Sequence, residues 1–393
     1  MALGGAELRQ VFEWQNPFQA TESAPRATIL AANANFPVEI QVRAFCLAAA
    51  DGPGSPLIIQ FSHGALKIIG GQGSVPVVSG ARLSRFVLEQ ALRESGASHV
   101  ASALDHFKVP PYPGDGREGG SRAVRVARAN VDDAREAARD LLGEVASPEL
   151  DAYSSYLSSP AYADFKREFA ATVLTLDPAW AMIDTERLPP ILDYALTRDL
   201  IDFTRRELGF GEMMLEAEYG ATGLAGKDRP YEPLRGDELA RFADEVASFV
   251  AYTGADGIAY PIGMEHGAPT GDRHEPDIER LSAVQTRILQ VAGRYVPFAQ
   301  HGGTGAARLA LGLVGKNNVN THFLVAAANR ITDRTLADVG RIRAGVKDAC
   351  GTGLYTGAEE AVREATVQKL KETGTFGVAI RLAAFVKQRT GVD

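Results

Sequence analysis

Cysteine is scarce in this chain, with only Cys46 and Cys350 among 393 residues. Two thiols cannot build a disulfide framework or a four-thiolate metal site, which excludes the small disulfide-rich classes of protein. Basic residues are also in the minority, because 41 Lys and Arg stand against 49 Asp and Glu and the net charge is −8. General nucleic-acid binding needs a basic face, so we expect no nucleic-acid partner. A local cationic site would still allow an anionic substrate.

Long apolar runs are missing too. No stretch approaches the ~18 apolar residues that a membrane-spanning helix needs. The start, MALGGAELRQVFEWQ, lacks the basic and apolar regions of a signal peptide. We therefore expect no membrane association and a cytoplasmic location. Nucleotide-binding loops are absent as well, since no GxGxxG follows an apolar run and residues 312–317 have the wrong spacing for a Walker A loop.

What the sequence does contain is a recurring unit of a short apolar run, a polar loop and a stretch with helical spacing. Near-continuous apolar runs separated by helices are typical of parallel strands that are covered on both faces. Eight runs qualify: 27–32, 56–61, 100–104, 179–183, 212–217, 257–262, 296–300 and 313–319. Eight units favour an α/β fold of the closed (β/α)8 barrel type over an open sheet, with residues 1–393 as a single TIM-barrel domain.

Helical spacing predicts return helices over residues 81–93, 122–145, 237–252 and 278–292. The connection between the third and fourth strands is too long for one return helix, so we expect an insertion at approximately residues 109–175. It contains the helical segment 122–145 and a tyrosine-rich helical stretch at 148–171. Residues 336–393 predict a helical C-terminal extension with a glycine-containing break at 351–357. This extension either closes the bottom of the barrel or makes a subunit contact.

A polar side chain follows each predicted strand within a residue or three. In order, these are Asn33, Ser62, Asp105 with His106, Asp184, Glu218, His266, His301, and Asn318 with Asn320. The carboxyl ends of all strands of a barrel converge on the face where active sites lie. We therefore expect these side chains to line one site.

Three of these groups are histidines, namely His106, His266 and His301, in a chain that has only seven. Three imidazoles that leave a fourth position open are typical of a catalytic Zn²⁺ site. The pattern therefore predicts such a site, and the alternative is that each is a hydrogen-bonded loop histidine. The other histidines lack this placement or, like His63, only border the mouth of the barrel.

Glycines flank two of the histidines, because His266 precedes Gly267 and His301 precedes Gly302 and Gly303. Glycine lets backbone N–H groups approach an anion closely, and the start of a following helix adds its dipole. Loops after the seventh and eighth strands of barrels frequently hold phosphate. We expect a phosphate site here, and the alternative is that the glycines only make tight turns.

Several motifs resemble, in order along the chain, those of the class II fructose-bisphosphate aldolase family. They are ANAN (32–35), QFSHG (60–64), ALDH (103–106), MID (182–184), LEAEYG (215–220), IGMEHG (262–267), HGGTG (301–305) and KNNVNT (316–321). The resemblance covers roughly residues 27–330 and is interrupted by the insertion. The Asp-His pair is specific only together with the two His-Gly motifs.

The resemblance implies a lyase that makes or cleaves a carbon–carbon bond through a metal-stabilised enediolate of a phosphorylated ketose such as fructose 1,6-bisphosphate. It implies that His106, His266 and His301 hold Zn²⁺. Glu218 would ligate a second or displaced metal position, with Asp184 close by, and the resemblance leaves open a second metal or a monovalent cation. Family members are commonly dimers or tetramers, so we expect a homodimer or homotetramer.

The resemblance also implies catalytic roles for Asp105, Asn33 and Asn318. Asp105 would move the proton of the hydroxyl at the bond that forms or breaks, and the two asparagines would orient the enediolate. The alternative for Asp105 is a carboxylate that only orients His106. The phosphate of a small phosphorylated sugar would be held by Ser62, Gly267, Gly302, Gly303, Thr304, Asn320 and Thr321.

The loop after Glu218 departs from the family pattern. Residues 218–228, EYGATGLAGKD, have no glutamate where the family places the residue that exchanges the donor's proton, and Asp228 or Glu232 are the nearby substitutes. Glu265 is also unusual beside His266. These departures favour a changed acceptor or donor. Two other functions stay open: a non-catalytic aldolase-like scaffold subunit, which would not need the histidines, and another metal-dependent lyase or epimerase acting on a sugar phosphate.

Overall fold

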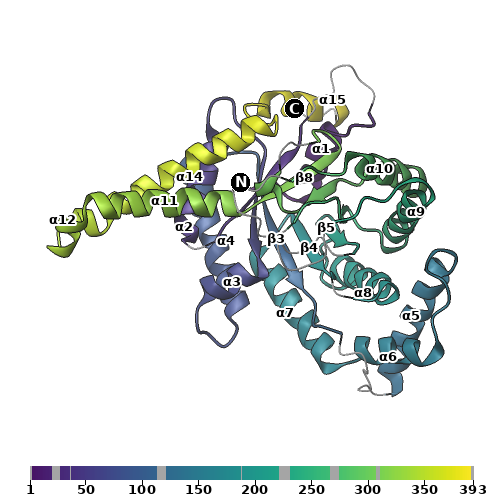
Figure 1. Cartoon of the computed structure of the whole chain (residues 1–393). Helices are drawn as coiled ribbons and strands as arrows, with labels where there is room; N and C mark the ends of the chain where they lie inside the picture. Colours follow the sequence, from purple (N-terminus) through teal and green to yellow (C-terminus); the bar gives the residue numbers. More distant parts are fainter. Residues whose placement is uncertain are drawn as a thin grey trace.

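The computed structural model describes residues 2–19, 27–35, 37–112, 121–186, 188–220, 231–265, 274–306 and 310–390. Its strands form a closed parallel barrel in chain order, in which β1 pairs with both β2 and β8 (Figure 1). The strands are β1 (Ile29–Asn33), β2 (Leu57–Ser62), β3 (Val100–Lys108), β4 (Trp180–Asp184), β5 (Met214–Glu218), β6 (Gly257–Ala259), β7 (Phe298–Gln300) and β8 (Val314–Val319). The predicted (β/α)8 barrel is confirmed, since a strand lies at each of the eight runs.

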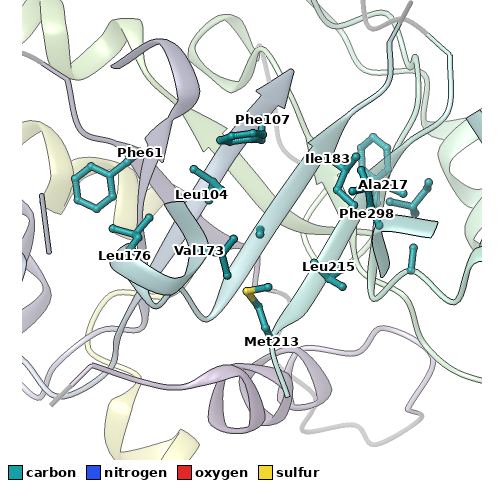
Figure 2. Packing of buried hydrophobic residues seen from close by; sticks show 14 of the residues in the cluster. Phe61, Leu104, Phe107, Val173, Leu176, Ile183, Met213, Leu215, Ala217 and Phe298 are labelled. Carbon is teal, nitrogen blue, oxygen red and sulfur yellow. The ribbon is translucent and has the colours of Figure 1, made fainter. Parts of the chain in front are cut away.

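Helices follow the first six strands and cover the barrel. They are α2 (Val38–Ala50), α3 (His63–Gly70) with α4 (Pro76–Ser95), α7 (Pro160–Leu176), α8 (Pro190–Asp202), α9 (Gly236–Thr253) and α10 (Ile278–Ala292). Figure 2 shows how one of them packs, with Val173 and Leu176 of α7 near Phe61 and Leu104 of the barrel wall. Burying such side chains stabilises the fold by about 1.5–3 kcal/mol each. Within the described part of the chain, no helix is both long and apolar enough to cross a membrane.

The long connection between β3 and β4 contains three helices. The predicted single helical stretch at 148–171 is wrong, because α6 (Ser147–Leu157) and α7 are separate. Proline at the start of α7 and the Ser159 hydroxyl, which accepts a hydrogen bond from Tyr162 N at 3.2 Å, mark the new helix start. α7 packs on α4 and β3, whereas α5 (Ser121–Leu142) packs on α8 and α9 (Figure 1). The extra chain therefore lies along the outer wall of the barrel.

The C-terminal residues form two different structures. α11 (Thr321–Ala337) and α14 (Thr352–Glu372) pair and extend away from the barrel, with α12 (Val339–Arg343) at the far end and α13 (Lys347–Cys350) preceding α14 (Figure 1). The predicted break at 351–357 is confirmed at Gly351, which separates α13 from α14, but it does not extend to Gly357, which lies within α14. A Cβ on Gly357 would lie 3.3 Å from Arg330 Cγ of α11, so this glycine serves close helix packing.

The bottom of the barrel is covered by both ends of the chain. α1 (Gly5–Trp14) and α15 (Ala379–Thr390) lie together, and Leu8 and Phe12 share an apolar cluster with Leu382 and with side chains from the amino ends of the strands. Of the two roles expected for the C-terminal extension, closure of the bottom is the one that α15 performs.

One interior contact requires a glycine. Trp180 is fully buried, and a Cβ on Gly257 of β6 would lie 2.4 Å from its indole ring. Overpacking a core costs about 1–3 kcal/mol, so Gly257→Ala should lower the free energy of unfolding by that amount in chemical denaturation. Gly211→Ala is the control, because a Cβ there would meet no atom within 4 Å. Equal stabilities of the two variants would contradict this packing.

Candidate active site

Asp105 and His106 lie at a bulge near the carboxyl end of β3. Leu104 pairs with Ala181 of β4, but Phe107 pairs with Ile183, so β3 has one extra residue here. His106 has a φ of +44°, a left-handed conformation that is uncommon for a residue with a side chain and typical of functional sites. A bulge re-aims side chains. As a result, two consecutive side chains both contact residues at the mouth of the barrel.

Four of the residues predicted to line the site, including His106, come together in the structure. His106, Asp184 and Glu218 bring one nitrogen or oxygen atom each within 4.8 Å of one another. His106 Nδ1 lies 3.0 Å from Asp184 Oδ2, and His301 Nδ1 lies 3.8 Å from Glu218 Oε1. The ring centroids of His106 and His301 are 4.6 Å apart. His266 and Gly267 lie outside the described residues, so the third histidine ligand stays a prediction.

Carboxylates dominate the electrostatics of this group. Burial works to lower the pKa of His106, but Asp105, Asp184 and Glu218 together raise it to about 10. Burial works to raise the pKa of Asp184, but the hydrogen bond and the charge of His106 lower it to about 2. Burial and the charge of Asp184 raise the pKa of Glu218 well above its usual range. The group therefore holds a proton tightly, and a metal cation could take the place of that proton.

Asp105 and Asn318 carry buried polar atoms that a ligand could satisfy. Asp105 Oδ2 accepts a hydrogen bond from Asn33 Nδ2 at 2.7 Å, and Gln60 Nε2 donates to Asn33 Oδ1. Asp105 Oδ1 and both polar side-chain atoms of Asn318 are buried and have no hydrogen-bond partner among the described residues. Buried polar groups without partners are rare in native proteins. These atoms are available to hydrogen-bond to a bound polar molecule or to water.

The glycines after His301 are needed for packing. Gly302 has a φ of +67°, and a Cβ on it would lie 2.4 Å from the carbonyl oxygen of Glu265. A Cβ on Gly303 would lie 2.1 Å from Asn317 Oδ1. Both positions therefore exclude a side chain, and a phosphate-binding role for their N–H groups stays a prediction.

The other predicted phosphate-binding residues lie at neighbouring strand ends. Ser62 is the N-cap of α3, where its hydroxyl accepts a hydrogen bond from Ala65 N at 3.1 Å. Asn320 Oδ1 accepts from Asn35 Nδ2 at 2.7 Å, and Thr321 begins α11. Thr304 Oγ1 accepts from the backbone N–H of the residue after Thr321 at 3.4 Å. Ser62 ends β2 and Asn320 follows β8. Both strands pair with β1, so the two residues lie at nearby strand ends.

A buried polar group that was not predicted from the sequence lies next to His301. His301 Nε2 lies 3.0 Å from Glu216 Oε1, and the other carboxylate oxygen of Glu216 contacts Lys316 and Trp180. Burial works to raise the pKa of Glu216, but Lys316 and His301 lower it to about 2. The pKa of His301 is lowered, because the effect of burial outweighs the hydrogen bond with Glu216, which works to raise it. The sequence did contain a signal for Glu216. Side chains two residues apart in a strand lie on the same face, so Glu216 lies on the same face as Glu218.

Comparison with known proteins identifies a matching family and a relative. The family model described as "Fructose-bisphosphate aldolase class-II" matches residues 175–378. YdjI of Escherichia coli K12, described as an uncharacterised protein, is 28% identical over 189 residues, which cover 47% of this chain and 59% of YdjI. This chain thus matches less than two thirds of the length of that curated relative.

Two solved structures share the fold. The crystal structure of the YdjI aldolase from Escherichia coli K12 has a TM-score of 0.55 and 19% identity, covering 94% of this chain and 98% of that one. The crystal structure of fructose-bisphosphate aldolase (Fba) from Campylobacter jejuni has a TM-score of 0.62 and 17% identity, covering 96% of each chain. At these identities the likeness concerns the fold.

Proposed function

Because this chain belongs to the class II fructose-bisphosphate aldolase family, we propose that it is a zinc-dependent lyase that makes or cleaves a carbon–carbon bond in a phosphorylated ketose. The observation that carries the proposal is the convergence of His106, Glu218 and His301 beside the buried carboxylate Asp105. Imidazole nitrogens and carboxylate oxygens are the donors that Zn²⁺ takes in catalytic sites.

In this proposal His106, His266 and His301 hold the ion, with Glu218 and Asp184 at its border. When bound, Zn²⁺ supplies Lewis-acid polarisation of a substrate carbonyl. Asp105 takes and returns the proton of the substrate hydroxyl at the bond that forms or breaks. This role is supported by its contacts, since Asn33 holds Oδ2 and the buried Oδ1 has no partner in the described part of the chain.

The remaining polar residues bind and orient the substrate. Asn318 offers one amide donor and one acceptor to substrate oxygens, and both are without partners among the described residues. We assign the phosphate to Ser62 at the start of α3 and to the Gly302–Gly303 loop, where backbone N–H groups and a short hydroxyl suit an anion. A scaffold subunit would gain nothing from buried polar groups without partners, which speaks against that alternative.

The assay that tests the proposal is retro-aldol cleavage of fructose 1,6-bisphosphate and tagatose 1,6-bisphosphate by the purified full chain, coupled to detection of the triose phosphates. We expect bound zinc in the purified protein, loss of cleavage after treatment with a chelator, and recovery when zinc is returned. Metal without cleavage of either sugar would favour another lyase or epimerase. Protein that takes up no zinc and cleaves neither sugar would overturn the proposal.

Zinc binding should become tighter as the pH rises. His106 must lose its proton to ligate a metal, and its pKa in the metal-free site is about 10. Below that pH, protons compete with zinc, so the affinity should rise at least about tenfold per pH unit. Competition with a chromophoric chelator between about pH 6.5 and 8.5 measures this slope. A zinc affinity that does not change with pH would show that zinc does not displace a proton from His106.

A further inference from the structure

A buried ion pair lies inside the barrel beside His301. Lys316 of β8 and Glu216 of β5 both have side chains that are 0% exposed, and Lys316 Nζ lies 2.6 Å from Glu216 Oε2. Trp180 Nε1 donates to the same oxygen at 2.6 Å, and the indole ring centroid is 4.9 Å from Nζ. Glu216 Oε1 is thus left to face His301 Nε2 at 3.0 Å.

Stability does not explain this pair. Removing both charges from water is costly, and apolar residues of similar size often replace a buried ion pair without loss. Other buried positions are filled by apolar side chains, such as Ala31, Ala101 and Met214, which share an apolar cluster with Trp180. A lysine and a glutamate in contact inside the barrel therefore call for a role other than filling it.

The role follows from what each atom can donate or accept. Lysine and the indole nitrogen can only donate, so the two bonds to Oε2 require Glu216 to accept there. Two donors from different strands also prevent the carboxylate from rotating. The remaining oxygen can then accept the ring proton of His301. A neutral imidazole that donates through Nε2 has its lone pair on Nδ1.

We propose that Glu216 and Lys316 are positioning residues that fix the tautomer and orientation of His301, so that Nδ1 is the nitrogen presented to the metal. The geometry at the other side of the ring fits, because Nδ1 lies 3.8 Å from Glu218 Oε1 and the ring faces His106 at 4.6 Å between centroids. The metal part of this inference rests on the proposed function, whereas the tautomer does not.

The tautomer can be read directly by NMR. Long-range ¹H–¹⁵N correlation spectra of the ¹⁵N-histidine-labelled full chain, with and without zinc, should show His301 protonated on Nε2. Loss of the signals in His301→Gln assigns them. Glu216→Gln, which can donate as well as accept, should give a mixture of tautomers in the metal-free protein. A wild-type His301 protonated on Nδ1 would overturn the proposal.

Zinc affinity tests the consequence for the metal. We expect Glu216→Gln and Lys316→Met each to weaken zinc binding about 10–100-fold in competition with a chromophoric chelator, because such supporting contacts have effects of that size. Arg205→Met is the control, since it breaks the 2.7 Å ion pair with Asp256 at the amino end of β6, away from His301. It should lower thermal stability and leave zinc affinity unchanged.

The double variant Glu216→Gln/Lys316→Met separates positioning from folding. It removes both charges at nearly constant volume, so it should melt at or near the wild-type temperature and still bind zinc weakly. Wild-type zinc affinity in this variant would overturn the proposal. Neither zinc affinity nor the tautomer needs an aldol substrate. Absence of aldol cleavage in the wild-type protein would therefore remove the proposed function and leave this inference to be decided by its own measurements.

Discussion

Asp105→Asn is expected to lower turnover by about 10²–10⁴ while zinc stays bound, because a positioned acid/base contributes a factor of that size. The variant keeps the shape of the side chain, and its amide oxygen can still accept from Asn33, which donates to Asp105 Oδ2 at 2.7 Å. What it removes is the ionisable carboxylate, to which we assign the proton transfer. Steady-state kinetics of aldol cleavage, together with metal analysis of the same samples, measure both quantities.

A matched control is available in the same fold. Asp193 of α8 is buried like Asp105, but it is hydrogen-bonded to Thr197 at 3.0 Å and lies outside the site. Asp193→Asn should leave turnover near normal, because burial raises the pKa of Asp193 to about 8 and the carboxyl is already neutral at lower pH. A near-normal rate in Asp105→Asn as well would reduce Asp105 to an orienting residue. The contacts speak against that alternative, since the carboxylate bonded to His106 is Asp184.

His301→Ala is expected to abolish aldol cleavage and to lower the zinc content of the purified protein. The imidazole lies between Glu216 at 3.0 Å and Glu218 at 3.8 Å, so its loss removes the nitrogen that we propose as a ligand and leaves two buried acidic side chains facing each other. Both effects should weaken zinc binding, since the proposed set of three nitrogen ligands would be reduced to two.

Folding must be separated from ligation in this experiment. His301→Gln, which retains a polar side chain, should lose zinc as well, and a thermal melt shows whether either variant is folded. His99→Ala is the histidine control, because His99 precedes β3 at the amino end of the strand. Full zinc content and full activity in His301→Ala would remove this residue from the ligand set.

The barrel could be predicted from the sequence because its strands are buried on both faces. All residues of β1, β4, β5 and β8 are buried, and β1 and β4 read as apolar runs that end in one polar residue. The convergence of strand ends then follows from the topology. His106, Asp184, Glu218 and His301 are brought together for this reason.

Other features depend on pairing and packing that a single sequence does not display. The bulge that turns Asp105 and His106 toward the mouth is a shift in register between two strands. Glu216 and Lys316 were assigned no role, because β5 and β8 are not adjacent and the contact between these side chains forms only across the closed barrel. Gly357 was misread as a break because its close contact with Arg330 exists only after α11 and α14 pair.

Anomalous diffraction at the zinc edge, from crystals of the full chain grown with zinc, tests the central claim most directly. We expect one strong peak bonded to nitrogens of His106 and His301, with His266 as a third ligand and Glu218 alongside. An ion bound elsewhere, or a zinc-loaded crystal in which these imidazoles contact no metal, would contradict the proposed site.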